Sequence, residues 1–172
     1  MLVVLIIGPP GVGKTSTLTA LEDLLTDRDV RHAAVEVEAL SWAHPPLSDP
    51  LTFRNVAAIR DAYAEAGYDL LVCGATVTSE AYLEGLFQAL RPAERIVVRL
   101  DADEPTLRER IERREPPEWS GLAGLLSAVG ELAAISRSLE NIDAVYSTTD
   151  LSPDEIALRV NAEVVAARVA TR

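Results

Sequence analysis

A glycine-rich segment near the start of the chain has the residue types and spacing of a phosphate-binding loop. Residues 8–15 read GPPGVGKT and match the pattern G-x-x-x-x-G-K-[ST]. Glycines let the backbone wrap so that several N–H groups point at one anion, and the N-terminus of a following helix adds positive potential. We therefore expect the phosphates of a nucleotide to be bound by Gly8, Pro9, Pro10, Gly11, Val12, Gly13, Lys14, Thr15 and Ser16.

Two side chains of this loop are expected to contact the phosphates and the metal ion directly. Lys14 is expected to reach the β- and γ-phosphates, and the hydroxyl of Thr15 is expected to bind Mg²⁺. Lys14 is also the sole lysine of a chain that is otherwise rich in arginine. A compact ammonium fits between phosphates where a planar guanidinium does not. The alternative is a glycine turn that joins a strand to a helix without binding a ligand.

Two glutamates, Glu36 and Glu38, alternate with valines in a segment that we expect to be a strand over residues 33–40. Period-two spacing places both on one side, and Glu38 lies nearer the carboxyl end, where parallel sheets bind ligands. A carboxylate there can accept the proton of an attacking hydroxyl, and Glu36 can hold a water bound to Mg²⁺ or contact the substrate. A solvated edge strand with an acidic face would give the same alternation.

Arginines recur at helical spacing later in the chain, in the segment TLRERIERRE. Arg110 and Arg114 are four residues apart, with Arg113 beside them, so a helix would place them on one face. Guanidinium groups stabilise charge that is spread over phosphoryl oxygens. The same pattern also fits a solvated helix with Glu–Arg ion pairs.

The residues after the predicted second strand are candidates for binding a second substrate. Trp42 is placed to cover an apolar or aromatic compound, or else to pack its own loop down. Arg54 is placed to bind an anionic group, or is a surface arginine at a helix start. Only Arg54 and Arg60 are arginines between residues 32 and 90, which favours an uncharged or singly charged hydroxyl compound.

The elements that must position these residues alternate between strands and helices. Apolar runs predict strands at residues 2–7, 33–40, 69–74, 95–100 and 144–146. Helical spacing and capping residues predict helices at residues 15–25, 51–66, 79–90, 104–114 and 122–139, and from 152 onwards. This order is typical of an α/β fold with a parallel sheet and helices on both faces.

Length and composition limit the classes of protein that the chain can belong to. With 172 residues we expect a single domain over 1–172. A net charge of −11 disfavours nucleic acid and anionic membranes as partners. A single cysteine, the absence of a signal peptide and the absence of a membrane-spanning apolar run predict a cytoplasmic protein, as a monomer or homodimer.

The loop, the segment VEVEAL, the segment TLRERIERRE and the segment YSTTDLSPDEIA together resemble the P-loop kinases of the nucleoside-monophosphate-kinase-like group. That group includes shikimate kinase, gluconate kinase and the chloramphenicol phosphotransferase-like enzymes. The resemblance implies a three-layer P-loop NTPase fold with strand order 2-3-1-4-5 and a short lid at about 113–125. The chain departs from the group in having glutamates where the group usually has aspartates.

The resemblance implies an enzyme that moves the γ-phosphoryl group of ATP, with Mg²⁺, to a hydroxyl of a small molecule. Lys14, Glu38, Arg110 and Arg114 are its predicted catalytic residues, and Arg110 also binds the nucleotide. A guanine-specific Asn/Thr-Lys-x-Asp motif is excluded because Lys14 is the sole lysine. The strand at 69–74 ends without an acid, which argues against a motor or switch. Two alternatives remain: a regulatory ATPase that controls a partner, and a nucleotide-binding protein without catalysis.

Overall fold

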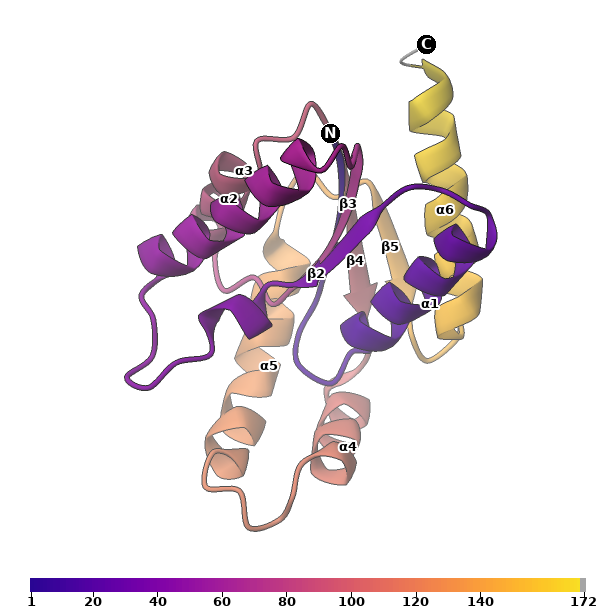
Figure 1. Cartoon of the computed structure of the whole chain (residues 1–172). Helices are drawn as coiled ribbons and strands as arrows, with labels where there is room; N and C mark the ends of the chain where they lie inside the picture. Colours follow the sequence, from indigo (N-terminus) through magenta and orange to yellow (C-terminus); the bar gives the residue numbers. More distant parts are fainter. Residues whose placement is uncertain (171–172) are drawn as a thin grey trace.

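In the computed structural model, which describes residues 1–170, a sheet of parallel strands lies at the centre of the molecule (Figure 1). The strand order is β2-β3-β1-β4-β5, which confirms the order implied by the sequence resemblance. The strands are β1 (Leu2–Ile7), β2 (Ala33–Glu36), β3 (Leu70–Ala75), β4 (Glu94–Asp101) and β5 (Ala144–Ser147).

The central strand, β1, explains why the sequence signal is strongest at the N-terminus. It pairs with β3 on one side and with β4 on the other along its full length, from Leu2 to Ile7. All of its residues are buried. A strand covered on both faces reads as a continuous apolar run, because neither set of alternating side chains meets water.

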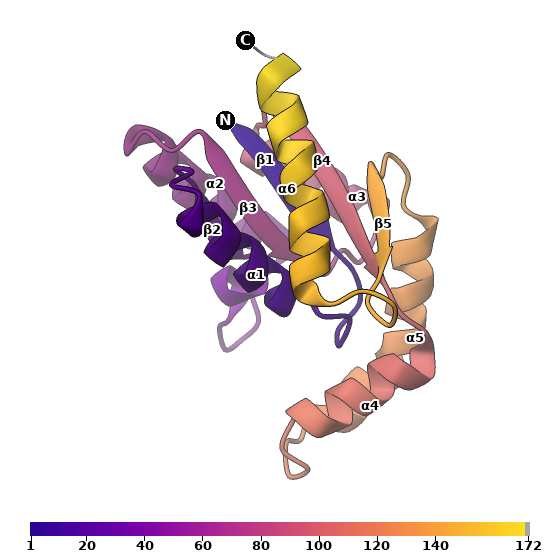
Figure 2. The ribbon, with the colours of Figure 1, turned by 90° about the vertical axis from the view of Figure 1, so that its right-hand side faces the viewer.

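Helices cover both faces of the sheet, which confirms the three-layer α/β architecture (Figures 1 and 2). The even-numbered side chains of β1 join the core with α1 and α6, whereas the odd-numbered ones pack with α2 and α3. Helix α4 and the first part of α5 project beyond the carboxyl ends of the strands, whereas the later part of α5 lies beside the sheet (Figure 2). The helices are α1 (Lys14–Asp27), α2 (Asp49–Glu65), α3 (Glu80–Leu90), α4 (Glu104–Arg114), α5 (Leu122–Ser138) and α6 (Pro153–Ala170).

The predicted strand over residues 33–40 is wrong in its second half. β2 ends at Glu36, and Glu38 begins a short 3-10 helix, η1 (Glu38–Ser41). The hydroxyl of Ser41 donates to the carbonyl of Glu38 at 2.8 Å and closes this turn. β2 lies at the edge of the sheet, next to β3, and its pairing with β3 ends at Glu36, so few strand hydrogen bonds are available to the residues that follow. Period-two alternation therefore does not govern the position of Glu38.

Among residues 1–170, no helix combines the length and the apolar character that a membrane crossing requires.

Candidate functional site

The glycine-rich loop between β1 and α1 adopts backbone angles that explain two of its glycines. Gly11 has φ +80° and Gly13 has φ +99°, both in the region that disfavours other residues. A Cβ on Gly11 would lie 2.8 Å from the carbonyl oxygen of Leu107 in α4, whereas a Cβ on Gly13 would have no atom within 4 Å. The loop thus packs directly under the helix that carries the arginines.

Lys14 is held inside this loop at the first turn of α1. Its side chain is nearly buried, and its Nζ donates to the carbonyl oxygens of Gly8 at 3.1 Å and Pro9 at 3.2 Å. Burial lowers the pKa of Lys14, while the nearby carboxylates of Glu38 and Glu36 act in the opposite direction. The ammonium therefore lies at the junction between the phosphate-binding loop and the two glutamates.

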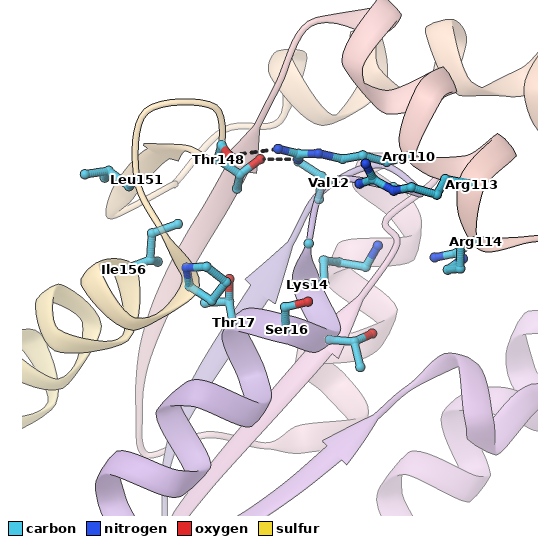
Figure 3. A pocket seen from close by; sticks show the side chains of 14 residues that line it. Val12, Lys14, Ser16, Thr17, Arg110, Arg113, Arg114, Thr148, Leu151 and Ile156 are labelled. Carbon is cyan, nitrogen blue, oxygen red and sulfur yellow. Dashed lines mark hydrogen bonds between the residues drawn. The ribbon is translucent and has the colours of Figure 1, made fainter.

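Three arginines from α4 face the loop across a cavity of about 490 Å³, which we call the arginine cavity. Arg110, Arg113 and Arg114 come from α4 and lie across the cavity from Lys14 and Ser16 at the start of α1, with Arg110 pointing to Thr148 (Figure 3). The cavity is lined by Gly11, Val12, Gly13, Lys14, Thr15, Ser16, Thr17, Arg110, Arg113, Arg114, Thr148, Leu151, Pro153 and Ile156. One end of it is cationic and rich in backbone N–H groups, and the other is largely apolar.

Arg110 connects the two ends of the arginine cavity. Its Nη1 donates to the hydroxyl of Thr148 at 2.8 Å and its Nη2 donates to the carbonyl oxygen of Thr148 at 2.9 Å (Figure 3). Thr148 follows β5, and beyond it Leu151 and Ile156 form the apolar end. A phosphate chain at the cationic end and a flat base at the apolar end match the chemistry of this cavity.

A second cavity, of about 680 Å³, lies next to the first, and we call it the glutamate cavity. It shares Lys14, Thr15 and Arg114 with the arginine cavity, so the two spaces meet at these side chains. Its lining is Pro10, Lys14, Thr15, Glu36, Glu38, Ala39, Trp42, Thr76, Arg114, Glu115, Trp119 and Leu125.

Glu38 is fixed at the wall of the glutamate cavity by one of its two oxygens. Its Oε1 accepts a hydrogen bond of 2.6 Å from the backbone N–H of Thr76, the residue after β3. Its Oε2 is buried and has no hydrogen-bond partner among residues 1–170. Because a buried polar atom without a partner is costly, this oxygen marks a position that a ligand donor or a water would occupy.

Glu36 reaches the same cavity from the end of β2. Its carboxylate lies over Gly74, its register partner in β3, so that a Cβ on Gly74 would fall 2.6 Å from Glu36 Oε2. The other oxygen of Glu36, Oε1, is also buried without a hydrogen-bond partner in the described part of the chain. The 3-10 helix η1 and the edge strand β2 thus bring together two carboxylates that the sequence analysis expected on one face of a single strand.

The residues available for a metal ion suit magnesium bound mainly through phosphate and water. Within residues 1–170, no group of three His, Cys, Asp or Glu side chains is placed to hold a metal ion. Mg²⁺ usually takes one or two protein ligands and completes its shell with phosphate oxygens and waters. Thr15, which lines both cavities, and Glu36, with its unpaired oxygen, fit that pattern.

The other predicted site residues differ in how they are placed. Trp42 follows η1, lines the glutamate cavity and is 83% exposed. Arg114 forms an ion pair with Glu115 at 2.6 Å. Arg54 lies exposed on α2 and is absent from the lining of both cavities, so the structure does not bring it to the site.

Sequence reasoning missed Thr76 as part of the site, and it included Thr148 only as one residue of the segment YSTTDLSPDEIA. Each follows a parallel strand at its carboxyl end, β3 and β5 respectively, and strand ends of this kind are where such sheets bind ligands. That position was a usable signal. The partners they make, with Glu38 and Arg110, are each 38 residues distant and give no local pattern.

Comparison with known proteins agrees with this geometry. A family model described as an AAA domain (AAA_33) matches residues 3–124, which include the loop, both glutamates and the arginines of α4. The chain belongs to this AAA-domain family. A sequence search among curated proteins finds no match for this AAA-domain protein.

Solved structures share the fold of this AAA-domain protein over nearly its whole length. A sugar kinase from Janibacter sp. HTCC2649 is 22% identical, with a TM-score of 0.66 over 92% of this chain and 91% of that chain. A gluconokinase from Sinorhizobium meliloti 1021 is 19% identical, with a TM-score of 0.62 over 96% and 95%. An APS kinase from Mycobacterium tuberculosis, in complex with AMPPNP and APS, is 20% identical, with a TM-score of 0.61 over 93% and 95%. The fold is therefore that of the P-loop small-molecule kinases, as the sequence resemblance predicted.

Proposed function

We propose that the protein is an ATP- and Mg²⁺-dependent phosphotransferase that moves the γ-phosphoryl group to a hydroxyl of a small molecule. The observation that carries this proposal is the pair of adjoining cavities, which share Lys14, Thr15 and Arg114. The arginine cavity has the chemistry to bind a nucleotide. The glutamate cavity offers space for an acceptor and a carboxylate, Glu38, beside the place where the two meet.

Positioning of the nucleotide rests on the loop and on Arg110. Backbone N–H groups between Gly8 and Lys14 hold the phosphates, and the ammonium of Lys14 neutralises charge at the terminal phosphate. Arg110, braced by its two bonds to Thr148, bounds the space between phosphates and base. Together these groups place the γ-phosphate at the boundary with the glutamate cavity, which lowers the entropy cost of transfer.

Glu38 is the general base of this proposal. Its Oε1 is held by the Thr76 amide, which leaves Oε2 to accept the proton of the acceptor hydroxyl. As that proton leaves, the hydroxyl oxygen bonds to the γ-phosphorus, the bond from this phosphorus to the β–γ bridging oxygen breaks, and ADP is the leaving group. Arg114 lines both cavities and stabilises the charge on the transferring group. The turn between α4 and α5, within the predicted lid at about 113–125, carries Trp119 over the acceptor side and helps to exclude water.

Magnesium fits the site through the hydroxyl of Thr15 and through a water held by Glu36. When bound, the ion supplies charge neutralisation on the phosphate oxygens. The shared fold of sugar kinase, gluconokinase and APS kinase supports transfer to a small molecule, although their names cover several different acceptors.

The proposal is tested by ATP turnover with and without a panel of sugars, polyols, nucleosides and amino alcohols. A kinase turns ATP over slowly alone and is stimulated by its acceptor, with the phosphorylated product visible by mass spectrometry. Glu38→Gln is expected to lower transfer by about 10²–10⁴-fold with little change in ATP affinity. Glu84→Gln, an exposed acid on α3, is the matched control. Acceptor-independent turnover at an unchanged rate, or full activity of Glu38→Gln, would contradict this function.

A further inference from the structure

The charge around the glutamate cavity bears on the chemical class of the acceptor. Three carboxylates line it, those of Glu36, Glu38 and Glu115, against two cations, Lys14 and Arg114. Two of these acids, Glu36 and Glu38, each keep a buried oxygen without a hydrogen-bond partner in the described chain. This part of the cavity wall is therefore acidic, and two of its buried carboxylate oxygens have no donor.

The two cations are already engaged and face the phosphate side. Arg114 pairs with Glu115 at 2.6 Å, and Lys14 donates to the carbonyl oxygens of Gly8 and Pro9. Both also line the arginine cavity, where the proposed function assigns them to phosphate. Magnesium-bound ATP is itself a dianion, so its arrival brings no net positive charge to the acceptor side.

We propose, on the basis of the function proposed above, that the acceptor carries no anionic group and donates at least two hydrogen bonds, as a polyol or an amino alcohol does. One donor is the hydroxyl that is phosphorylated, which bonds to Oε2 of Glu38, and the second bonds to Oε1 of Glu36, which leaves Oε2 of Glu36 for the water bound to magnesium. A carboxylate or phosphate on the acceptor would face two carboxylates that each keep one buried oxygen without a partner, in a partly desolvated space where like charges repel strongly. The apolar part of the acceptor packs against Trp42 and Trp119, which line the same cavity from the residue after η1 and from the turn before α5.

The position of Glu36 shows that this acidic wall is a built feature of the sheet. Its carboxylate occupies the space that a side chain on Gly74 would take, since the three atoms nearest a Cβ there are all from the Glu36 carboxyl group. Gly74→Ala therefore displaces the carboxylate without changing the charge of the protein. It provides a second variant, besides Glu36→Gln, in which the donor-seeking oxygen is moved.

The chain offers a direct optical probe of this cavity. Trp42 and Trp119 are its two tryptophans, and both line the glutamate cavity. Their fluorescence reports ligand binding at this position whether or not phosphoryl transfer follows. Two matched ligand series vary charge on one scaffold: glucose, glucosamine and glucuronate, and then 3-phenylpropane-1,2-diol, phenylalaninol and 3-phenyllactate. Each is titrated into the protein with MgADP present.

Within at least one series, we expect the neutral and cationic members to change the fluorescence and the anionic member to bind at least about tenfold more weakly. The double variant Glu36→Gln with Glu38→Gln should bring the anionic member to within about threefold of the neutral one. Gly74→Ala should weaken the neutral and cationic members. The control, Glu84→Gln with Glu163→Gln, removes two exposed acids elsewhere and should keep the discrimination of the unmodified protein.

Tighter binding of the anionic members, equal discrimination in the double variant, or no fluorescence change with any member would each overturn the inference. Its failure is separable from that of the proposed function. Selective binding of neutral and cationic members without product formation would support the acceptor class while contradicting the kinase. Product formation with a preference for the anionic members would do the reverse.

Discussion

The contact between the phosphate-binding loop and α4 makes a quantitative prediction for two neighbouring glycines. Both Gly11 and Gly13 have positive φ, so alanine at either position costs about 1–2 kcal/mol of backbone strain. At Gly13 nothing lies within 4 Å of the new Cβ, and the strain is the whole cost. At Gly11 the Cβ would lie 2.8 Å from the Leu107 carbonyl, which is backbone and cannot rotate away.

Helix α4 must therefore shift to accommodate Gly11→Ala, at a further cost of about 1–3 kcal/mol. The expected loss of unfolding free energy is about 2–5 kcal/mol for Gly11→Ala and about 1–2 kcal/mol for Gly13→Ala. Because α4 carries Arg110 and Arg114, a shift of α4 should also weaken nucleotide binding in the arginine cavity. Gly11→Ala should thus lose most of the stabilisation that MgATP gives to the unmodified protein.

Urea unfolding, with and without saturating MgATP, measures both effects. With a slope of about 2 kcal/mol per molar urea, the extra cost of Gly11→Ala corresponds to a midpoint lower by about 0.5–1.5 M than that of Gly13→Ala. Circular dichroism checks that each variant is folded at the start. If Gly11→Ala is no less stable than Gly13→Ala, the close packing of the loop against α4 is wrong.

Two further predictions concern side chains that the site holds in place. Lys14→Met should abolish ATP binding and should stabilise the nucleotide-free protein, because burial disfavours the charged form of Lys14 and lowers its pKa. Burial lowers the pKa of Lys14, so the unmodified protein loses this penalty as the pH rises towards 10.5, the ordinary lysine pKa. The free energies of unfolding of the two proteins should therefore converge as the pH approaches that value, and a gap that widens with pH would contradict the assignment. Thr148→Val removes one of the two acceptors of Arg110. It should weaken ATP binding several-fold, measured by calorimetry, and lower the free energy of unfolding by about 0.5–1.5 kcal/mol, measured by urea unfolding. An unchanged ATP affinity would show that Arg110 does not contribute to nucleotide binding.

Much of the fold was predictable because its signals are local. The buried strands β1 and β3 appear as continuous apolar runs, and β4 contains the buried apolar run IVV. Each of the three strands was expected within one residue of its observed bounds. The start of α6 was equally clear. Ser152 accepts a hydrogen bond from the N–H of Glu155 at 3.2 Å, and the carboxylate of Glu155 accepts one from the N–H of Ser152 at 2.8 Å. These reciprocal bonds form within four residues, so their residue types are legible in the sequence.

The features of the site that could not be predicted from the sequence depend on contacts between distant segments. The turn at Glu38 arises where an edge strand runs out of ladder, and its orientation is fixed by the Thr76 amide. The cavity shared by Trp42 and Trp119 joins η1 to the turn after α4. Neither pairing leaves a periodic pattern in the chain. Arg54 is the opposite case. Its position in the sequence suggested a substrate-binding residue, but it lies on an exposed part of α2, outside both cavities.

The proposed function requires that the loop between β1 and α1 binds a nucleoside triphosphate through its amides and Lys14. Calorimetric titration of ATP, with Mg²⁺ present, into the folded protein measures this binding. We expect one site per chain, with a dissociation constant between about 1 μM and 1 mM, and no detectable heat of binding for Lys14→Met, which should remain folded. Absence of binding by the well-folded unmodified protein, or an unchanged affinity in Lys14→Met, would contradict the account.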